Sequence, residues 1–138
     1  MPHGYGYFTF GFNQAEREAD RIRKFNERWK RLTTIHEYLL NDFVRPLDSA
    51  SERLTVSEYS KFVEYLEEVS SWNNAISSSI DDANQNHLTR YSTSIRKLAM
   101  KAIRLCQKYD VYGDIEAIEY VAKQKTIVFN GEALYYIG

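Results

Sequence analysis

The chain has 138 residues, of which 43% are hydrophobic and 27% charged, and its formal net charge is -1. This composition excludes a disordered chain, and the length favours a single domain, 1–138, with a substantial buried core. The near-zero charge excludes binding to nucleic acid or anionic lipid through bulk charge, so only local charged patches remain as candidates.

Aromatic residues dominate the first segment, 1–12. Phe8, Phe10 and Phe12 recur at a period of two, which is typical of a half-buried strand. We expect this segment to be a strand that joins the C-terminal strands, with a free aromatic arm as the alternative. Four tyrosines from the first segment and the last strand are candidates for a protein-binding surface: Tyr5, Tyr7, Tyr135 and Tyr136.

Three long helices are expected over 13–109, because this stretch has no glycine and its apolar residues recur at spacings of three and four. The first, 13–44, begins at Asn13 and should end before Pro46, which cannot continue a helix. It would be roughly 45 Å long, so the molecule should be elongated. Its predicted core-facing row is Ile22, Phe25, Trp29, Leu32, His36, Leu39 and Phe43.

The second and third helices show the same spacing of apolar residues. The predicted row of the second is Tyr59, Phe62, Leu66, Val69, Asn73, Ile76, Ile80 and Ala83. The predicted row of the third is Leu88, Tyr91, Ile95, Leu98, Ala102, Leu105 and Tyr109. The second should begin at Thr55, where Glu58 completes a capping box, and fade near 84–86. The third is expected over 88–109. Because the connections between the helices are short, an antiparallel bundle or a helical hairpin is favoured.

The C-terminal segment, 110–138, has a different pattern. A short fourth helix is expected first, followed by a β-hairpin whose turn is formed by Asn130 and Gly131. This turn places Ile127 opposite Leu134. The predicted fold is therefore mainly α: an elongated three-helix bundle or helical hairpin with a short fourth helix and a small antiparallel sheet, made of the N-terminal strand and the C-terminal hairpin.

Few residues suggest enzyme chemistry. No histidine has a metal-ligating partner three or four residues away, and one cysteine cannot form a zinc site, so we expect no metal and no cofactor. His36 is more simply explained as a core histidine than as a pH-sensitive buried group or a ligand. Cys106 lacks a nearby histidine in the sequence and is more simply explained as a buried structural thiol than as a catalytic one. Glu64, Glu67 and Glu68 are interpreted as a solvated face. With no phosphate-binding loop or nucleophile motif, the protein is expected not to be an enzyme.

Charge is divided between the second and third helices. Residues 55–85 carry six acids and one lysine, whereas 87–109 carry six cations and no acid. Five of these cations form a basic stripe: Arg90, Lys97, Lys101, Arg104 and Lys108. We favour pairing of the two helices within the chain or between subunits, with nucleic acid and an acidic protein partner as the alternatives.

Together these patterns predict a non-enzymatic, intracellular protein-binding module, such as an inhibitor, adaptor or assembly protein. Viral and mobile-element proteins include modules of this kind. It would dock a helical or aromatic surface on a protein partner or on a second copy, and a homo-oligomer is expected. The single cysteine and the absence of a secretory signal or a long apolar span predict a cytoplasmic location without membrane attachment. The alternative function is nucleic-acid binding by the basic stripe.

Overall fold

The computed structural model describes residues 2–111, 126–129 and 132–136, with side chains for residues 13–111. Within these residues the chain is mainly helical. In chain order the elements are α1 (Pro2–Leu39), the π-helical turn η1 (Leu40–Val44), α2 (Arg45–Ser49), the 3-10 turn η2 (Ser51–Arg53), α3 (Val56–Ser78), α4 (Gln85–Tyr109), β1 (Thr126–Phe129) and β2 (Glu132–Tyr136).

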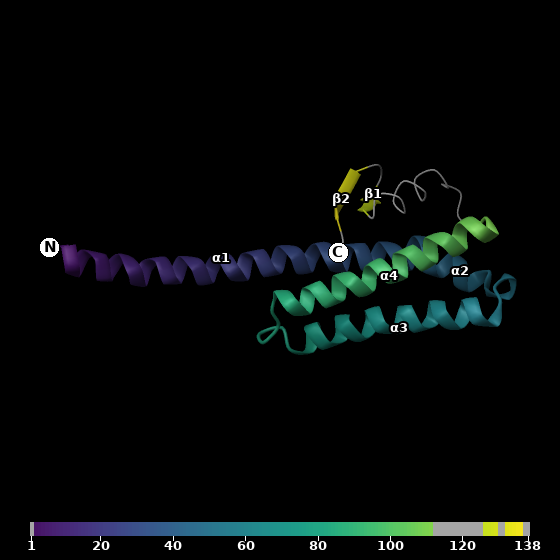
Figure 1. Ribbon diagram of the computed structural model, residues 1–138, viewed down its shortest axis with the longest axis horizontal. Coiled ribbons are helices and arrows are strands. Elements are labelled where there is room, and N and C mark those ends of the chain that lie inside the picture. The colour runs from purple at the N-terminus through teal and green to yellow at the C-terminus, as the bar shows by residue number, and fades with distance from the viewer. Residues whose placement is uncertain (1, 112–125, 130–131, 137–138) are drawn as a thin grey trace.

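The central helix of the bundle is α4. It packs against both α1 and α3, and Figure 1 shows α3 and α4 side by side, running in opposite directions. In contrast, α1 runs in the same direction as α4, because Arg28 contacts Gln85 and His36 contacts Tyr91. The predicted elongated helical bundle is therefore confirmed.

The core fills the space between α4 and its two neighbours. The largest fully buried side chains are Leu32, Ile35, Leu39, Leu47, Phe62, Ile76, Leu88, Tyr91, Ile95, Leu98 and Ile103. Most residues of the predicted apolar rows are buried or half-buried. The exceptions are Ile22, Tyr59 and Ile80, which are 47%, 37% and 41% exposed and lie toward the ends of their rows. The apolar spacing therefore predicted which residues form the core, but it did not predict where along each helix the burial ends.

The N-terminal segment differs from the prediction. Residues 2–12 are the first turns of α1, so the predicted N-terminal strand is wrong, and so is the small sheet that included it. An arm separate from the helices does not describe this segment either, because it continues directly into the first long helix. Adding a residue to an existing helix gains one hydrogen bond, whereas a strand needs a partner strand. Pro2 fits the first turn, where its missing N–H has no helical acceptor.

Pro46 does not stop the helical path. It occupies the first turn of α2, which follows directly on the π-helical turn η1. Proline lacks an N–H, and its ring clashes with the carbonyl four residues earlier in a regular helix. The wider π turn accommodates this clash, because its hydrogen bonds join residues five apart. The predicted helix end near Val44 is therefore wrong, since helical backbone continues to Ser49.

Side-chain caps fix the starts of α3 and α4. The predicted capping box of Thr55 and Glu58 is confirmed, with the Glu58 N–H donating to Thr55 Oγ1 at 3.1 Å and the Thr55 N–H donating to Glu58 Oε1 at 2.9 Å. Asn84 and His87 form a second capping box, so α4 begins three residues earlier than predicted. The end of α3 at Ser78 also precedes the predicted one, because serines compete for backbone hydrogen bonds.

The two strands pair with each other in antiparallel fashion. Their register places Ile127 opposite Tyr135 and Val128 opposite Ala133, with an irregularity between Ile127 and Val128. The predicted pairing of Ile127 with Leu134 is therefore wrong. The predicted fourth helix and the turn of Asn130 and Gly131 lie outside the described residues.

Candidate functional site

The N-terminal part of α1 extends beyond the rest of the bundle. Figure 1 shows this part of the helix continuing past the ends of α3 and α4. Among the described side chains of α1, Phe25 is the first that is buried. Arg28 marks the level at which α4 begins, since its guanidinium donates to Gln85 Oε1 at 2.8 Å and to Thr89 Oγ1 at 3.2 Å. We call residues 2–24 the projecting segment; its length is roughly 35 Å.

Ion pairs along the helix join most of the charged side chains described in the projecting segment; Glu16 and Arg17 form none within the described residues. Arg21 pairs with Glu18 at 2.6 Å, and Lys24 pairs with Asp20 at 2.9 Å. Arg23 also pairs with Asp20 and lowers the pKa of that carboxyl, as Arg21 does for Glu18. Pairs at this spacing stabilise an exposed helix modestly. The segment therefore presents few unsatisfied charges to a partner helix.

An apolar row runs along the projecting segment. Its described members, Ala15, Ala19 and Ile22, are exposed, and Ile22 is 47% exposed. The helical backbone of α1 places three more positions in the same row, at spacings of three and four: Tyr5, Phe8 and Phe12. The row leads into Phe25 and Trp29, where the contact with α4 begins. The row therefore continues the α1 face that contacts α4, past the N-terminal end of α4 at Gln85.

The four candidate tyrosines fall on two different elements. Tyr5 and Tyr7 belong to α1, and Tyr135 and Tyr136 belong to β2; their side chains lie outside the described part. Figure 1 shows the N-terminal end of α1 away from β2. The structure therefore does not bring the two pairs together, and the joint surface expected from a shared sheet has no basis in the fold.

The basic stripe faces the acidic helix α3 over part of its length. Lys108 Nζ lies 2.6 Å from Glu58 Oε2, and Lys97 Nζ lies 3.6 Å from Glu68 Oε1. Arg90 lies over the ring of Trp72, 5.8 Å from its centroid. The two remaining cations of the stripe, Lys101 and Arg104, form no ion pair within the described residues. Three of the five cations are thus used in contacts between α3 and α4.

Glu58 connects the start of α3 to the end of α4. Besides its capping role, its carboxylate accepts hydrogen bonds from Lys108 Nζ and from the Tyr109 hydroxyl. The hydrogen bond from Lys108 lowers the pKa of Glu58 most, followed by those from Tyr109 and the Thr55 backbone, and the pKa falls to about 2. The capping pattern revealed Glu58 in the sequence, but its contacts with α4 depend on residues fifty positions away.

His36 and Tyr91 form a buried polar pair between α1 and α4. His36 Nδ1 lies 2.8 Å from the Tyr91 hydroxyl, and the His36 side chain is 5% exposed. Its other ring nitrogen, Nε2, is buried and has no hydrogen-bond partner among the residues that the structure describes. Burial lowers the pKa of His36, which favours the neutral ring. The arrangement agrees with the interpretation as a core histidine.

The other candidates for chemistry are Cys106 and the acidic residues of α3. Burial raises the pKa of Cys106 to about 12, which keeps the thiol protonated and unreactive. Glu64 and Glu67 are exposed, and Glu68 pairs with Lys97. In the part of the chain that the structure describes, no group of three or more histidine, cysteine, aspartate or glutamate residues is arranged to hold a metal ion.

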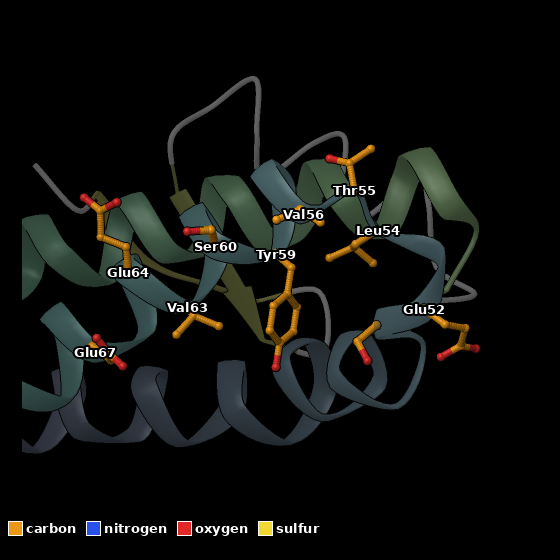
Figure 2. Close-up of a pocket in the computed structure, with 10 residues that line it drawn as sticks. Glu52, Leu54, Thr55, Val56, Tyr59, Ser60, Val63, Glu64 and Glu67 are labelled. Atoms are coloured by element: carbon orange, nitrogen blue, oxygen red, sulfur yellow. The ribbon is translucent and has the colours of Figure 1, made fainter.

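An open groove that the sequence did not reveal lies along the first half of α3 (Figure 2). Its volume is about 750 Å³. Its lining includes Leu54, Val56, Tyr59, Val63, Glu52, Glu64 and Glu67. The one signal for it in the sequence is Val56, an apolar residue that lies outside the predicted core-facing row of its helix and is 88% exposed.

Comparisons of the chain with models of protein families, with curated proteins and with solved structures find no match. Among the described helices, none has the length and apolar character required to cross a bilayer.

Proposed function

We propose that the protein is a non-enzymatic protein-binding module that assembles with a second copy of itself through the projecting segment. The observation that supports this most is the exposure of α1 before Phe25: among residues 13–24 every side chain except Asp20 is exposed. A helix of this length that carries Gly4, Gly6 and Gly11 is marginal in water without a partner, because most helix stability in proteins comes from packing of an apolar face.

An antiparallel arrangement of two copies suits the apolar row. The aromatic residues of the row occupy its first half, and small or aliphatic residues occupy its second half. With position 12 of one copy opposite position 15 of the other, position 8 lies opposite 19 and position 5 opposite 22. Each aromatic position then lies opposite an alanine or an isoleucine and not opposite another aromatic position. Alternation of large and small residues across an interface allows close packing, as in protein cores.

A second copy also suits the ends of this row. At its C-terminal end the row joins the packed interface between α1 and α4, so a partner helix would extend an interface that already exists. The ion pairs along the helix involve Glu18, Asp20, Arg21, Arg23 and Lys24, which leaves the row itself free of charged residues.

The experiment is light scattering coupled to size-exclusion chromatography on the full chain and on two matched variants. Phe12→Glu places a charge in the proposed interface and should convert the dimer to a monomer. Phe10→Glu removes the same kind of side chain two residues away, on the opposite side of the helix, and should leave the dimer intact. A monomeric wild type, or equal loss of the dimer in both variants, would contradict the proposal.

Nucleic-acid binding by the basic stripe has less support. Lys108 and Lys97 are paired with α3 acids, and Arg90 lies on Trp72, which leaves Lys101 and Arg104 as the candidates for phosphate contacts. The double variant with Lys101→Glu and Arg104→Glu should therefore fold and assemble normally. A salt-sensitive affinity for DNA or RNA that this variant loses would support the alternative instead.

A further inference from the structure

The groove on α3 is a second surface, separate from the projecting segment. It runs from η2 along the first three turns of α3. Figure 2 shows Tyr59 pointing from α3 toward the chain at α2, where its hydroxyl lies 3.4 Å from Asp48 Oδ1. Thr55 and Val56 begin the helix at one end, and Glu67 closes the other end.

The middle of the groove is apolar. Val56 is 88% exposed and Tyr59 is 37% exposed, and these are two of the four large hydrophobic side chains exposed within the described part. Leu54 and Val63 are half-buried beside them. A single exposed apolar residue is ordinary, whereas a contiguous set that lines a hollow is typical of an interaction surface.

Both ends of the groove are acidic. Figure 2 shows Glu52 at one end and Glu64 and Glu67 at the other. The lining contains no lysine or arginine. Glu52 and Glu67 form no ion pair within the described residues, and Glu64 has only a long contact of 3.6 Å with Lys61. A surface of this kind attracts and orients a cationic partner.

We propose that this groove binds a basic amphipathic helix of another protein. The partner would place apolar side chains on Val56, Tyr59 and Val63 and lysine or arginine side chains against the glutamates at the two ends. The groove favours a helix over a strand, because Val56, Tyr59, Ser60, Val63 and Glu67 follow one face of α3 over three turns, and helices dock on such faces through side chains three and four apart.

The test uses the full chain and a synthetic amphipathic helix, with central leucines at spacings of three and four and lysines near both ends. Binding is measured by fluorescence anisotropy at low and moderate salt. The double variant with Val56→Ser and Glu67→Lys should weaken binding at least tenfold. A second peptide with every lysine replaced by glutamate should show no binding.

A matched control variant distinguishes the groove from general attraction to acidic residues. Ile80 is 41% exposed and Asp81 follows it, both outside the groove. The variant with Ile80→Ser and Asp81→Lys therefore makes the same chemical changes elsewhere and should bind the lysine peptide as the wild type does. Circular dichroism and thermal unfolding are used to check that both variants fold.

Three results would overturn the proposal. The first is equal loss of binding in the two double variants. The second is full binding by the single variant Val56→Ser, which would leave only charge attraction. The third is a different oligomeric state in the double variant with Val56→Ser and Glu67→Lys, with the fold unchanged. It would show that a second copy of the chain occupies the groove. The first two results do not bear on the projecting segment, so in those cases this proposal fails without the proposed function. The third result is read beside Phe12→Glu, because a dimer that Phe12→Glu leaves intact and the groove variant dissociates would contradict both proposals.

Discussion

Lys108 Nζ in the last turn of α4 donates a hydrogen bond to Glu58 Oε2 in the first turn of α3 over 2.6 Å. The Tyr109 hydroxyl donates to the same carboxylate. One side chain therefore caps α3 and joins it to the opposite end of the antiparallel helix. This contact helps to set how α3 lies on α4, and α3 carries the groove.

Replacement of Glu58 by glutamine should change the dependence of stability on pH. The pKa of Glu58 in the folded protein is about 2, against 4.5 for a free carboxyl, so its stabilisation is complete above pH 4.5 and is lost as the pH falls toward 2. The difference in unfolding free energy between the wild type and Glu58→Gln, measured with urea, should therefore be largest near neutral pH and shrink below pH 4.5.

Glu64→Gln is the control for this experiment. Glu64 is exposed, and its contact with Lys61 joins two residues of the same helix at 3.6 Å. Such pairs contribute little to stability. If the glutamine variants at positions 58 and 64 gave the same pH profile, the link between α3 and α4 through Glu58 would not contribute to stability.

The buried pair of His36 and Tyr91 should make the fold sensitive to mild acid. Burial lowers the pKa of His36 below 6.5, so the unfolded state takes up a proton more readily as the pH falls below that value. Stability should be constant above pH 6.5 and decrease below it. In His36→Phe this decrease should be smaller, as measured by thermal unfolding between pH 7 and 5. An unchanged profile would contradict the buried position of the ring.

Tyr91→Phe tests the hydrogen bond of this pair without a change in volume. It removes the hydroxyl that lies 2.8 Å from His36 Nδ1 and leaves that nitrogen buried. An unsatisfied buried polar group costs about 1–3 kcal/mol, so the unfolding free energy at pH 7 should fall by about that amount. Tyr65→Phe, on the partly exposed side of α3, is a matched control and should change stability little.

The sequence predicted the three long helices and the cap of α3, which depend on local pattern, but the predicted start of the first helix at Asn13 is wrong, because α1 already begins at Pro2. The capping box of Thr55 and Glu58 and the apolar rows of the three helices involve residues a few positions apart, so their physical cause is visible in the sequence. The aromatic residues of the first segment were ambiguous. The spacing of Phe8, Phe10 and Phe12 fits a strand, whereas the spacing of Tyr5, Phe8 and Phe12 fits a helix. The segment is helical because it continues directly into the rest of α1.

Features that depend on distant residues could not be predicted in this way. The effect of Pro46 depends on the π-helical turn before it, and the groove depends on how α2 and η2 pack beside α3. The sequence did show that acids and cations separate onto two helices. Which of them pair, as Lys108 and Glu58 do, is set by the relative position of two packed helices.

Cys106 should be unreactive in the folded protein. Burial raises the pKa of its thiol to about 12, so almost no thiolate is present at neutral pH. Iodoacetamide at pH 8 should modify it only after unfolding in urea, as followed by mass spectrometry. A cysteine introduced at the exposed position of Ser71 in a Cys106→Ser background should react at once. Equal native reactivity at the two sites would show that the region around Cys106 opens readily.

The antiparallel pairing of two projecting segments is tested most directly by disulfide cross-linking in a Cys106→Ser background. In the proposed register the two copies of position 15 are offset along the helix by three residues, about 4.5 Å, whereas those of position 19 are offset by eleven residues, about 16.5 Å. Ala15→Cys should therefore form a covalent dimer under mild oxidation, and Ala19→Cys should remain a non-covalent dimer. Cross-linking of both variants to the same extent, or of neither, would contradict the account.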